Sequence, residues 1–147
     1  MAVVRFVSYI AAANYQNGKF RMLSVEEIEA AKAATKYGPK PPHHEHIDCI
    51  RIAYEWLDAQ VKTKGQNRSA RPLKHHIEKW AGRYVSQSDV EVAAHLHPDI
   101  GGLYPYFNIS SRLVRPSQNR LSGIGEAGAH RTTYVEKPES KIYARDE

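Results

Sequence analysis

The chain has a single cysteine, Cys49, among its 147 residues. No disulfide can form within it, so the fold does not depend on oxidation, which favours a reducing compartment. No apolar run approaches the roughly 20 residues that a membrane-spanning helix needs. The mildly apolar stretch over residues 1–13 is interrupted by Arg5 and lacks the basic leader of a signal peptide. We therefore expect a soluble, cytoplasmic protein that does not contact a membrane.

Sequence motifs of catalysis are also scarce. The chain has no GxSxG motif and no phosphate-binding loop. Gly123, Gly125 and Gly128 have GxGxxG spacing, but no strong strand pattern precedes them and no long helix pattern follows, as a dinucleotide site requires. Cys49 falls inside an amphipathic helical pattern, where a small buried residue is the usual interpretation. We expect neither an enzyme nor a cofactor.

The chain has eight histidines, and three of them lie near the cysteine: His43, His44 and His46 precede Cys49. His46 and Cys49 are three residues apart and can share one side of a helix. Zinc usually takes four ligands in two spaced pairs. The remaining pair would have to come from His75 with His76, or from His95 with His97. Neither has the spacing of a known zinc finger, so we expect no metal site.

What the chain does have is positive charge and large side chains. Its net charge is +5 with a pI near 9.3, and it contains two Trp, nine Tyr and three Phe. Such residues can anchor a core, and the length suits one domain with at most a small appendage. The charge is compatible with nucleic acid or with an acidic protein partner.

Hydrophobic spacing and capping signals predict several helices. Apolar residues recur every three or four positions over residues 45–62, which is typical of a core helix. Ser24 with Glu27, and Ser88 with Glu91, have the spacing of capping boxes that begin helices. Gly82 is suited to end one. The predicted helices cover residues 25–36, 45–62, 72–81, 89–97 and 109–114.

The β signals are short. Residues 3–10 are rich in β-branched and aromatic side chains, Asn17-Gly18 is a turn signal, and residues 131–135 favour a strand. The predicted class is mainly α, or α+β. The predicted organisation is an N-terminal segment over residues 1–42 with one helix and a proline-rich linker, a helical core domain over residues 43–135, and a mobile tail over residues 136–147.

One stretch resembles a known family of DNA-binding proteins. Residues 89–94, DVEVAA, and 109–113, ISSRL, are similar to the two helices of bacterial helix-turn-helix repressors. The connection over residues 97–108 is longer than the usual turn of three or four residues. This length suits a winged-helix variant, or no DNA reader at all. The resemblance implies a DNA-binding unit over residues 72–135 in a transcriptional regulator of double-stranded DNA, and regulators of this kind are usually homodimers.

The resemblance also assigns residues. The N-terminal part of the second helix would contact base edges through Asn108, Ser110, Ser111 and Arg112. Phosphates would be bound by Arg115, Arg120 and Arg131. A second basic run would follow the phosphate backbone through Lys62, Lys64, Arg68, Arg71 and Lys74.

The alternative is a protein-binding module, for example a phage or plasmid protein that inhibits a host nucleic-acid-processing enzyme by covering it. Tyr104, Tyr106 and Phe107 form an aromatic cluster beside Gly and Pro, and Tyr is favoured at interfaces. The two hypotheses differ at residues 97–108. If the following helix projects, DNA is the expected partner. If Tyr104 and Tyr106 project, a protein is.

Overall fold

The computed structural model describes residues 15–16, 19–20, 22–134 and 142–147. Residues 3–10, for which the sequence favours a strand over a helix that continues into residues 11–13, and the predicted turn at Asn17-Gly18 lie outside the described residues. Two short strands, β1 (Tyr15–Gln16) and β2 (Lys19–Phe20), pair antiparallel. The described chain is mainly helical with two small two-stranded sheets.

Four predicted helices are confirmed. They are α2 (Val25–Ala34), α3 (Ile47–Asp58), α4 (Leu73–Ala81) and α5 (Gln87–Leu96). The capping box of Ser24 and Glu27 begins α2, and Gly82, with φ of 63°, ends α4 in the left-handed region that favours glycine.

The capping box of α5 begins two residues earlier than the sequence suggests. Ser86 is the N-cap, and its hydroxyl accepts from the N–H of Asp89, whose carboxylate accepts from the N–H of Ser86. The prediction that Ser88 caps this helix is wrong. Its hydroxyl accepts instead from the N–H of His43 at 2.9 Å, which ties the segment before α3 to α5.

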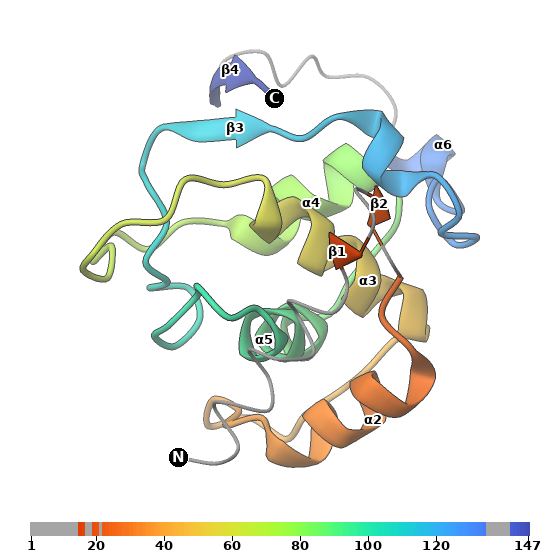
Figure 1. The fold of residues 1–147 in the computed structure, drawn as a ribbon, viewed down its shortest axis with the longest axis horizontal. Coiled ribbons are helices and arrows are strands. Elements are labelled where there is room, and N and C mark those ends of the chain that lie inside the picture. The colour runs from red at the N-terminus through yellow and green to blue at the C-terminus, as the bar shows by residue number, and fades with distance from the viewer. Residues whose placement is uncertain (1–14, 17–18, 21, 135–141) are drawn as a thin grey trace.

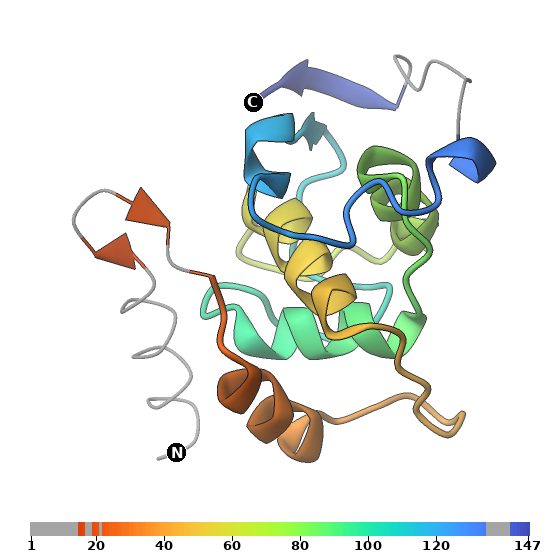
Figure 2. The ribbon, with the colours of Figure 1, turned by 90° about the vertical axis from the view of Figure 1, so that its right-hand side faces the viewer.

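The core is built around α3. Figure 1 and Figure 2 show α3 in the middle of the molecule, with α5 along one side of it and α2 outside α5. The largest fully buried side chains include Trp56 and Tyr54 of α3 and Phe107 from the loop after α5. Leu23 and Ile28 belong to the same core cluster, so the core contains residues from both sides of position 42.

The helix predicted over residues 109–114 is wrong. Ile109 forms an antiparallel bridge with Lys62, and β3 (Leu113–Arg115) follows it. Residues 97–117, all of them described, contain no helix. The physical reason is that Phe107 and Ile109 are buried two positions apart, a strand-like alternation. The backbone of Phe107 and Ile109 also pairs with the distant loop over residues 61–71, at Asn67 and Lys62.

The last part of the chain also differs from expectation. The strand predicted over residues 131–135 is wrong where it is described, because Arg131–Tyr134 is a short helix, α6. A 3₁₀ turn, η1 (Gln118–Leu121), precedes it. Residues 142–147 were expected to belong to a mobile tail. They instead contain β4 (Tyr143–Asp146), which pairs parallel with β3. In Figure 2, β4 lies along the top of the molecule.

Candidate functional site

Two loops far apart in sequence pair along one edge of the molecule. We call residues 61–71 and 97–112 together the loop pair; both lie at the left of Figure 1. Their backbones are joined by hydrogen bonds from the N–H of Thr63 to Asn108 O (2.8 Å), of Asn67 to Phe107 O (3.1 Å) and of Ser110 to Val61 O (2.8 Å). The loops therefore brace each other like a short, irregular sheet.

Two polar side chains hold the loop pair together. The amide of Asn108 accepts from the N–H of Gly101 at 2.8 Å and donates to the carbonyls of Asp99 and Thr63. The guanidinium of Arg71 donates to the carbonyls of Ser110 (3.0 Å) and Ile109 (3.3 Å). These bonds satisfy backbone groups that the loops would otherwise leave unpaired.

The aromatic residues of the loop pair divide between the core and the surface. Phe107 is buried, and Tyr104 packs against it with its hydroxyl accepting from the N–H of Lys74. Tyr106 is 41% exposed and Leu103 is 57% exposed. Of the four large apolar side chains that are exposed among the described residues, three belong to the loop pair: Val61, Leu103 and Tyr106. The fourth, Val25, begins α2.

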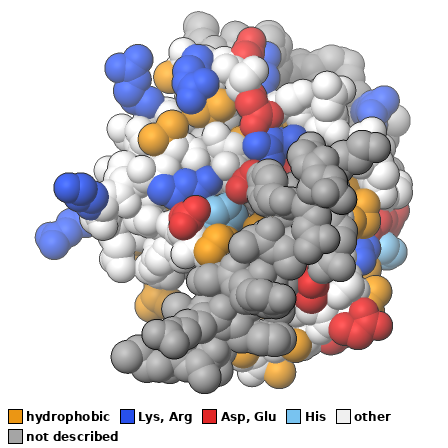
Figure 3. Space-filling model, viewed as in Figure 1, with side chains coloured by type: hydrophobic (Ala, Val, Ile, Leu, Met, Phe, Trp, Pro, Cys, Tyr) orange, Lys and Arg blue, Asp and Glu red, His pale blue; other side chains and the backbone are white. Residues whose placement is uncertain are grey.

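Three basic side chains of the loop pair are exposed as well, and they are Lys64, Arg68 and Arg112. In Figure 3, Lys and Arg side chains project from the left of the molecule, where Figure 1 places the loops. The edge therefore combines positive charge with apolar and aromatic area on a braced backbone.

The structure disperses the predicted DNA contacts. Ser111 is exposed beside Arg112, and Ser110 accepts from the N–H of Arg112. Arg131 is exposed on α6, on the other side of the molecule in Figure 1. Lys64 and Arg68 are exposed on the loop pair. The other six predicted contacts engage the protein itself: Asn108 and Arg71 as described, Lys62 with the carbonyl of Asp58, Lys74 with Glu78, Arg115 with Asp146, and Arg120 with three carboxylates.

Arg120 is the centre of a charged cluster that the sequence does not indicate. Its guanidinium donates to Glu55 of α3 at 3.0 Å, to Asp58 at 2.9 Å and to Glu147 after β4 at 2.8 Å. His97 donates from Nε2 to Asp58 at 2.8 Å, because its Nδ1 accepts from the N–H of Asp99. Burial lowers the pKa of Arg120, but the bonds to Glu147 and Asp58 outweigh it and raise the pKa above its ordinary value.

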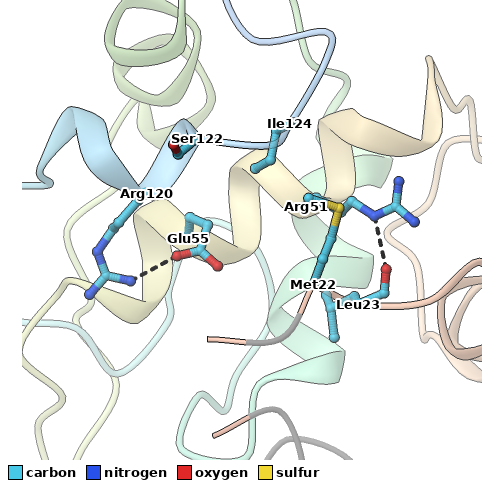
Figure 4. Close-up of a pocket in the computed structure, with 7 residues that line it drawn as sticks. All are labelled: Met22, Leu23, Arg51, Glu55, Arg120, Ser122 and Ile124. Carbon is cyan, nitrogen blue, oxygen red and sulfur yellow. Dashed lines mark hydrogen bonds and ion pairs between the residues drawn. The ribbon is translucent and has the colours of Figure 1, made fainter. Parts of the chain in front are cut away.

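Glu55 is the deepest carboxyl of this cluster. Burial raises its pKa to about 7, the charge and hydrogen bond of Arg120 oppose the rise, and the charges of Asp58 and Glu147 add to it. Three carboxylates share one guanidinium, so the most buried of them retains a proton most readily. Beside it is a pocket of about 60 Å³ (Figure 4), lined by Met22, Leu23, Arg51, Glu55, Arg120, Ser122 and Ile124.

The histidine and cysteine residues before and within α3 have structural partners. His44 lies 2.9 Å from both Asp89 and the hydroxyl of Tyr37, and His46 caps α3 by accepting from the N–H of Asp48. Burial raises the pKa of the Cys49 thiol to about 12, which makes it a poor nucleophile and metal ligand. In the described parts of the chain, no group of three or more His, Cys, Asp or Glu is placed to hold a metal ion.

Comparisons with protein-family models, with curated proteins and with solved structures found no match to this chain. Among the helices of the described residues, none is long and apolar enough to cross a membrane.

Proposed function

We propose that the protein is a protein-binding module whose loop pair contacts the partner. The observation that carries this proposal is the division of the aromatic residues: Tyr104 and Phe107 pack inward and fix the loop, while Leu103 and Tyr106 project. Tyr at a rigid site provides contact area with little loss of conformational entropy on binding. A braced backbone reduces the cost of ordering the loops further.

The exposed charges indicate the chemistry of the partner. Lys64, Arg68 and Arg112 surround exposed apolar side chains on the same loop pair. A complementary surface has an apolar recess for Leu103 and Tyr106 with carboxylates at its rim. Charges at the rim of an interface mainly raise the association rate and fix the orientation of the partners.

Double-stranded DNA is the second candidate, and the same three exposed basic residues favour it. Three phosphate contacts would give a slope of log K against log salt of only about −2.7, typical of weak, sequence-independent binding. With no helix between residues 97 and 117, the loop pair has no recognition helix to place in the major groove. This favours the protein partner.

The test compares two variants of the full chain in nuclease-treated lysate. Leu103→Ser/Tyr106→Ser removes the projecting apolar pair, and Val25→Ser removes from α2 an apolar side chain that is 50% exposed, between the 57% of Leu103 and the 41% of Tyr106. We expect the wild type and Val25→Ser to retain a stoichiometric protein partner, and the double variant to lose it. Equal retention by all three proteins would overturn the role of the loop pair.

A gel-shift titration on duplex DNA separates the two candidates. At about 50 mM salt, where phosphate contacts are strongest, we expect only weak binding that Arg112→Ala reduces on all sequences alike. Tight, sequence-selective binding that survives about 200 mM salt would favour DNA over protein.

A further inference from the structure

The β3–β4 pair has a feature independent of the loop pair: β4 with the residue after it lies against the edge of β3 and contacts Trp56, Arg115 and Arg120 at its two ends. We call this strip of the protein surface the groove. One edge of β3 is closed, since Val114 N–H donates to the side chain of Gln60 and Gln60 donates back to Val114 O, both at 2.9 Å. The other edge pairs with β4, and the N–H of Glu147 donates to Arg115 O at 2.9 Å.

Both ends of the groove recognise particular side chains. At one end, the indole N–H of Trp56, a fully buried residue of α3, donates to the hydroxyl of Tyr143 at 3.0 Å. The guanidinium of Arg115 lies 5.4 Å from the centre of the Tyr143 ring. A tyrosine therefore binds there through its ring and its hydroxyl.

At the other end of the groove, the carboxylate of Glu147 is the ligand. It accepts from Arg120 Nε at 2.8 Å and from the N–H of Ser117 at 2.8 Å. Between these ends, Ala144, Arg145 and Asp146 are exposed. The groove thus selects a tyrosine and a carboxylate four residues apart, which an extended chain separates by about 13 Å.

Emptying this groove would be costly. The indole N–H of Trp56 would lose its partner, and Arg120 would keep only Glu55 and Asp58. A buried donor without a partner is unfavourable, so a ligand that supplies a hydroxyl to Trp56 and a carboxylate to Arg120 is favoured. Addition of an extended segment to a free strand edge, with side-chain sites giving the specificity, is a recurrent mode of peptide binding.

We propose that the groove formed by β3, η1 and the C-terminal half of α3 is a peptide-binding site, filled here in cis by residues 143–147. Its ligand class is an extended segment of another protein with a tyrosine four residues before a carboxylate. Such a segment displaces β4, which then acts as a built-in competitor.

The experiment measures binding of a labelled peptide, Ile-Tyr-Ala-Arg-Asp-Glu, by fluorescence anisotropy. The full chain is compared with Tyr143→Ala/Glu147→Ala, which frees the groove, and with Arg145→Ala, a control at an exposed position of β4. A tethered segment typically has an effective concentration on the order of millimolar. We therefore expect the double variant to bind the peptide about tenfold or more tightly than the wild type or the control.

Peptide variants test the two recognition ends. Replacing the tyrosine or the final glutamate of the peptide by alanine should each weaken binding to the double variant by about tenfold, since each removes about 1.5 kcal/mol or more of hydrogen bonding. Equal affinity for all three peptides, or equal affinity of the wild type and the double variant, would overturn the proposal.

A second measurement uses the wild type, so that it does not depend on the variant folding. Unlabelled peptide is added to ¹⁵N-labelled full chain to several millimolar. We expect the amide signals of residues 143–147 to move toward unpaired positions while those of α3 and α5 stay in place. Unchanged signals for residues 143–147 at saturating peptide would refute displacement of β4.

Discussion

The loop pair and the β3–β4 groove each place an arginine beside paired backbone segments, but the two arginines have different partners. Arg71 donates to the carbonyls of Ile109 and Ser110. Arg120 donates to three carboxylates. Carbonyl partners leave the positive charge of Arg71 uncompensated, whereas the cluster around Arg120 has more negative than positive charge.

This difference shows why the charge of a residue in the sequence does not predict a phosphate contact. Arg71 donates from both terminal nitrogens to backbone carbonyls and Arg120 donates to carboxylates, so neither guanidinium is directed at a partner outside the protein. The free positive charge lies at exposed neighbours such as Arg112 and Lys64. A partner would therefore meet the loop pair as a basic surface and the groove as a set of hydrogen-bonding sites.

Removing the charge of Arg120 should have the largest effect. Arg120→Met keeps much of the volume but leaves Glu55 and Asp58 close together without their cation. Breaking one partner out of a buried charged group costs about 3–5 kcal/mol, and we expect about 3 kcal/mol here because Arg120 is partly exposed. Urea denaturation at pH 7.5 measures the loss.

The matched control is Arg112→Met on the loop pair, an exposed position where we expect a change below about 0.5 kcal/mol. The loss in Arg120→Met should also shrink in mild acid, as Glu55 becomes protonated. Equal effects of the two substitutions would mean that the cluster around Arg120 contributes no more than a surface charge.

Features that depend on residues close together in the sequence could be predicted. The four longer helices follow from apolar spacing and end signals near Ser24 and Gly82, and the structure has them within a few residues of the predicted ends. The segment over residues 109–114 is short, and local pattern could not decide it. Its conformation depends on Lys62 and Arg71, which pair with it across about 40 residues or more of chain.

The charged cluster was beyond prediction for the same reason. Arg120 meets Glu55 and Asp58 across 65 and 62 residues, and Glu147 across 27. No spacing rule connects residues at such separations. Glu55 and Asp58 are three residues apart on α3, so helical periodicity predicts that the two carboxylates lie close together. It does not predict which cation lies between them.

On the loop pair, the side chain of Asn108 contacts backbone groups of both loops. Asn108→Ala removes three hydrogen bonds to backbone groups of both loops, and we expect the free energy of unfolding to fall by about 2 kcal/mol. The control, Asn119→Ala in η1, is at an exposed position where we expect little change. Amide hydrogen exchange should increase at Thr63 and Gly101 in the first variant. Unchanged exchange there would show that the loops are held together without Asn108.

The third expected effect depends on pH and concerns the proton on Glu55. Its pKa is about 7 in the folded protein against an ordinary 4.5, so the folded state holds a proton that the unfolded state releases between these values. The stability from that proton is fully present below about pH 4.5 and is lost as the pH rises through 7. Glu55→Gln has no proton to lose and keeps a carbonyl oxygen for Arg120. We expect the variant to match the wild type at pH 5 and to exceed its free energy of unfolding by about 2 kcal/mol at pH 8.

Urea denaturation from pH 5 to pH 8 measures this difference, with Glu29→Gln, an exposed position on α2, as the control that keeps the wild-type slope. If Glu55→Gln instead loses stability relative to the wild type as the pH rises, the ionised carboxylate is the form that Arg120 stabilises. The ion pair between Glu55 and Arg120 would then stabilise the charged cluster without a retained proton. Arg71 and Arg120 would in that case differ only in how strongly their partners bind them.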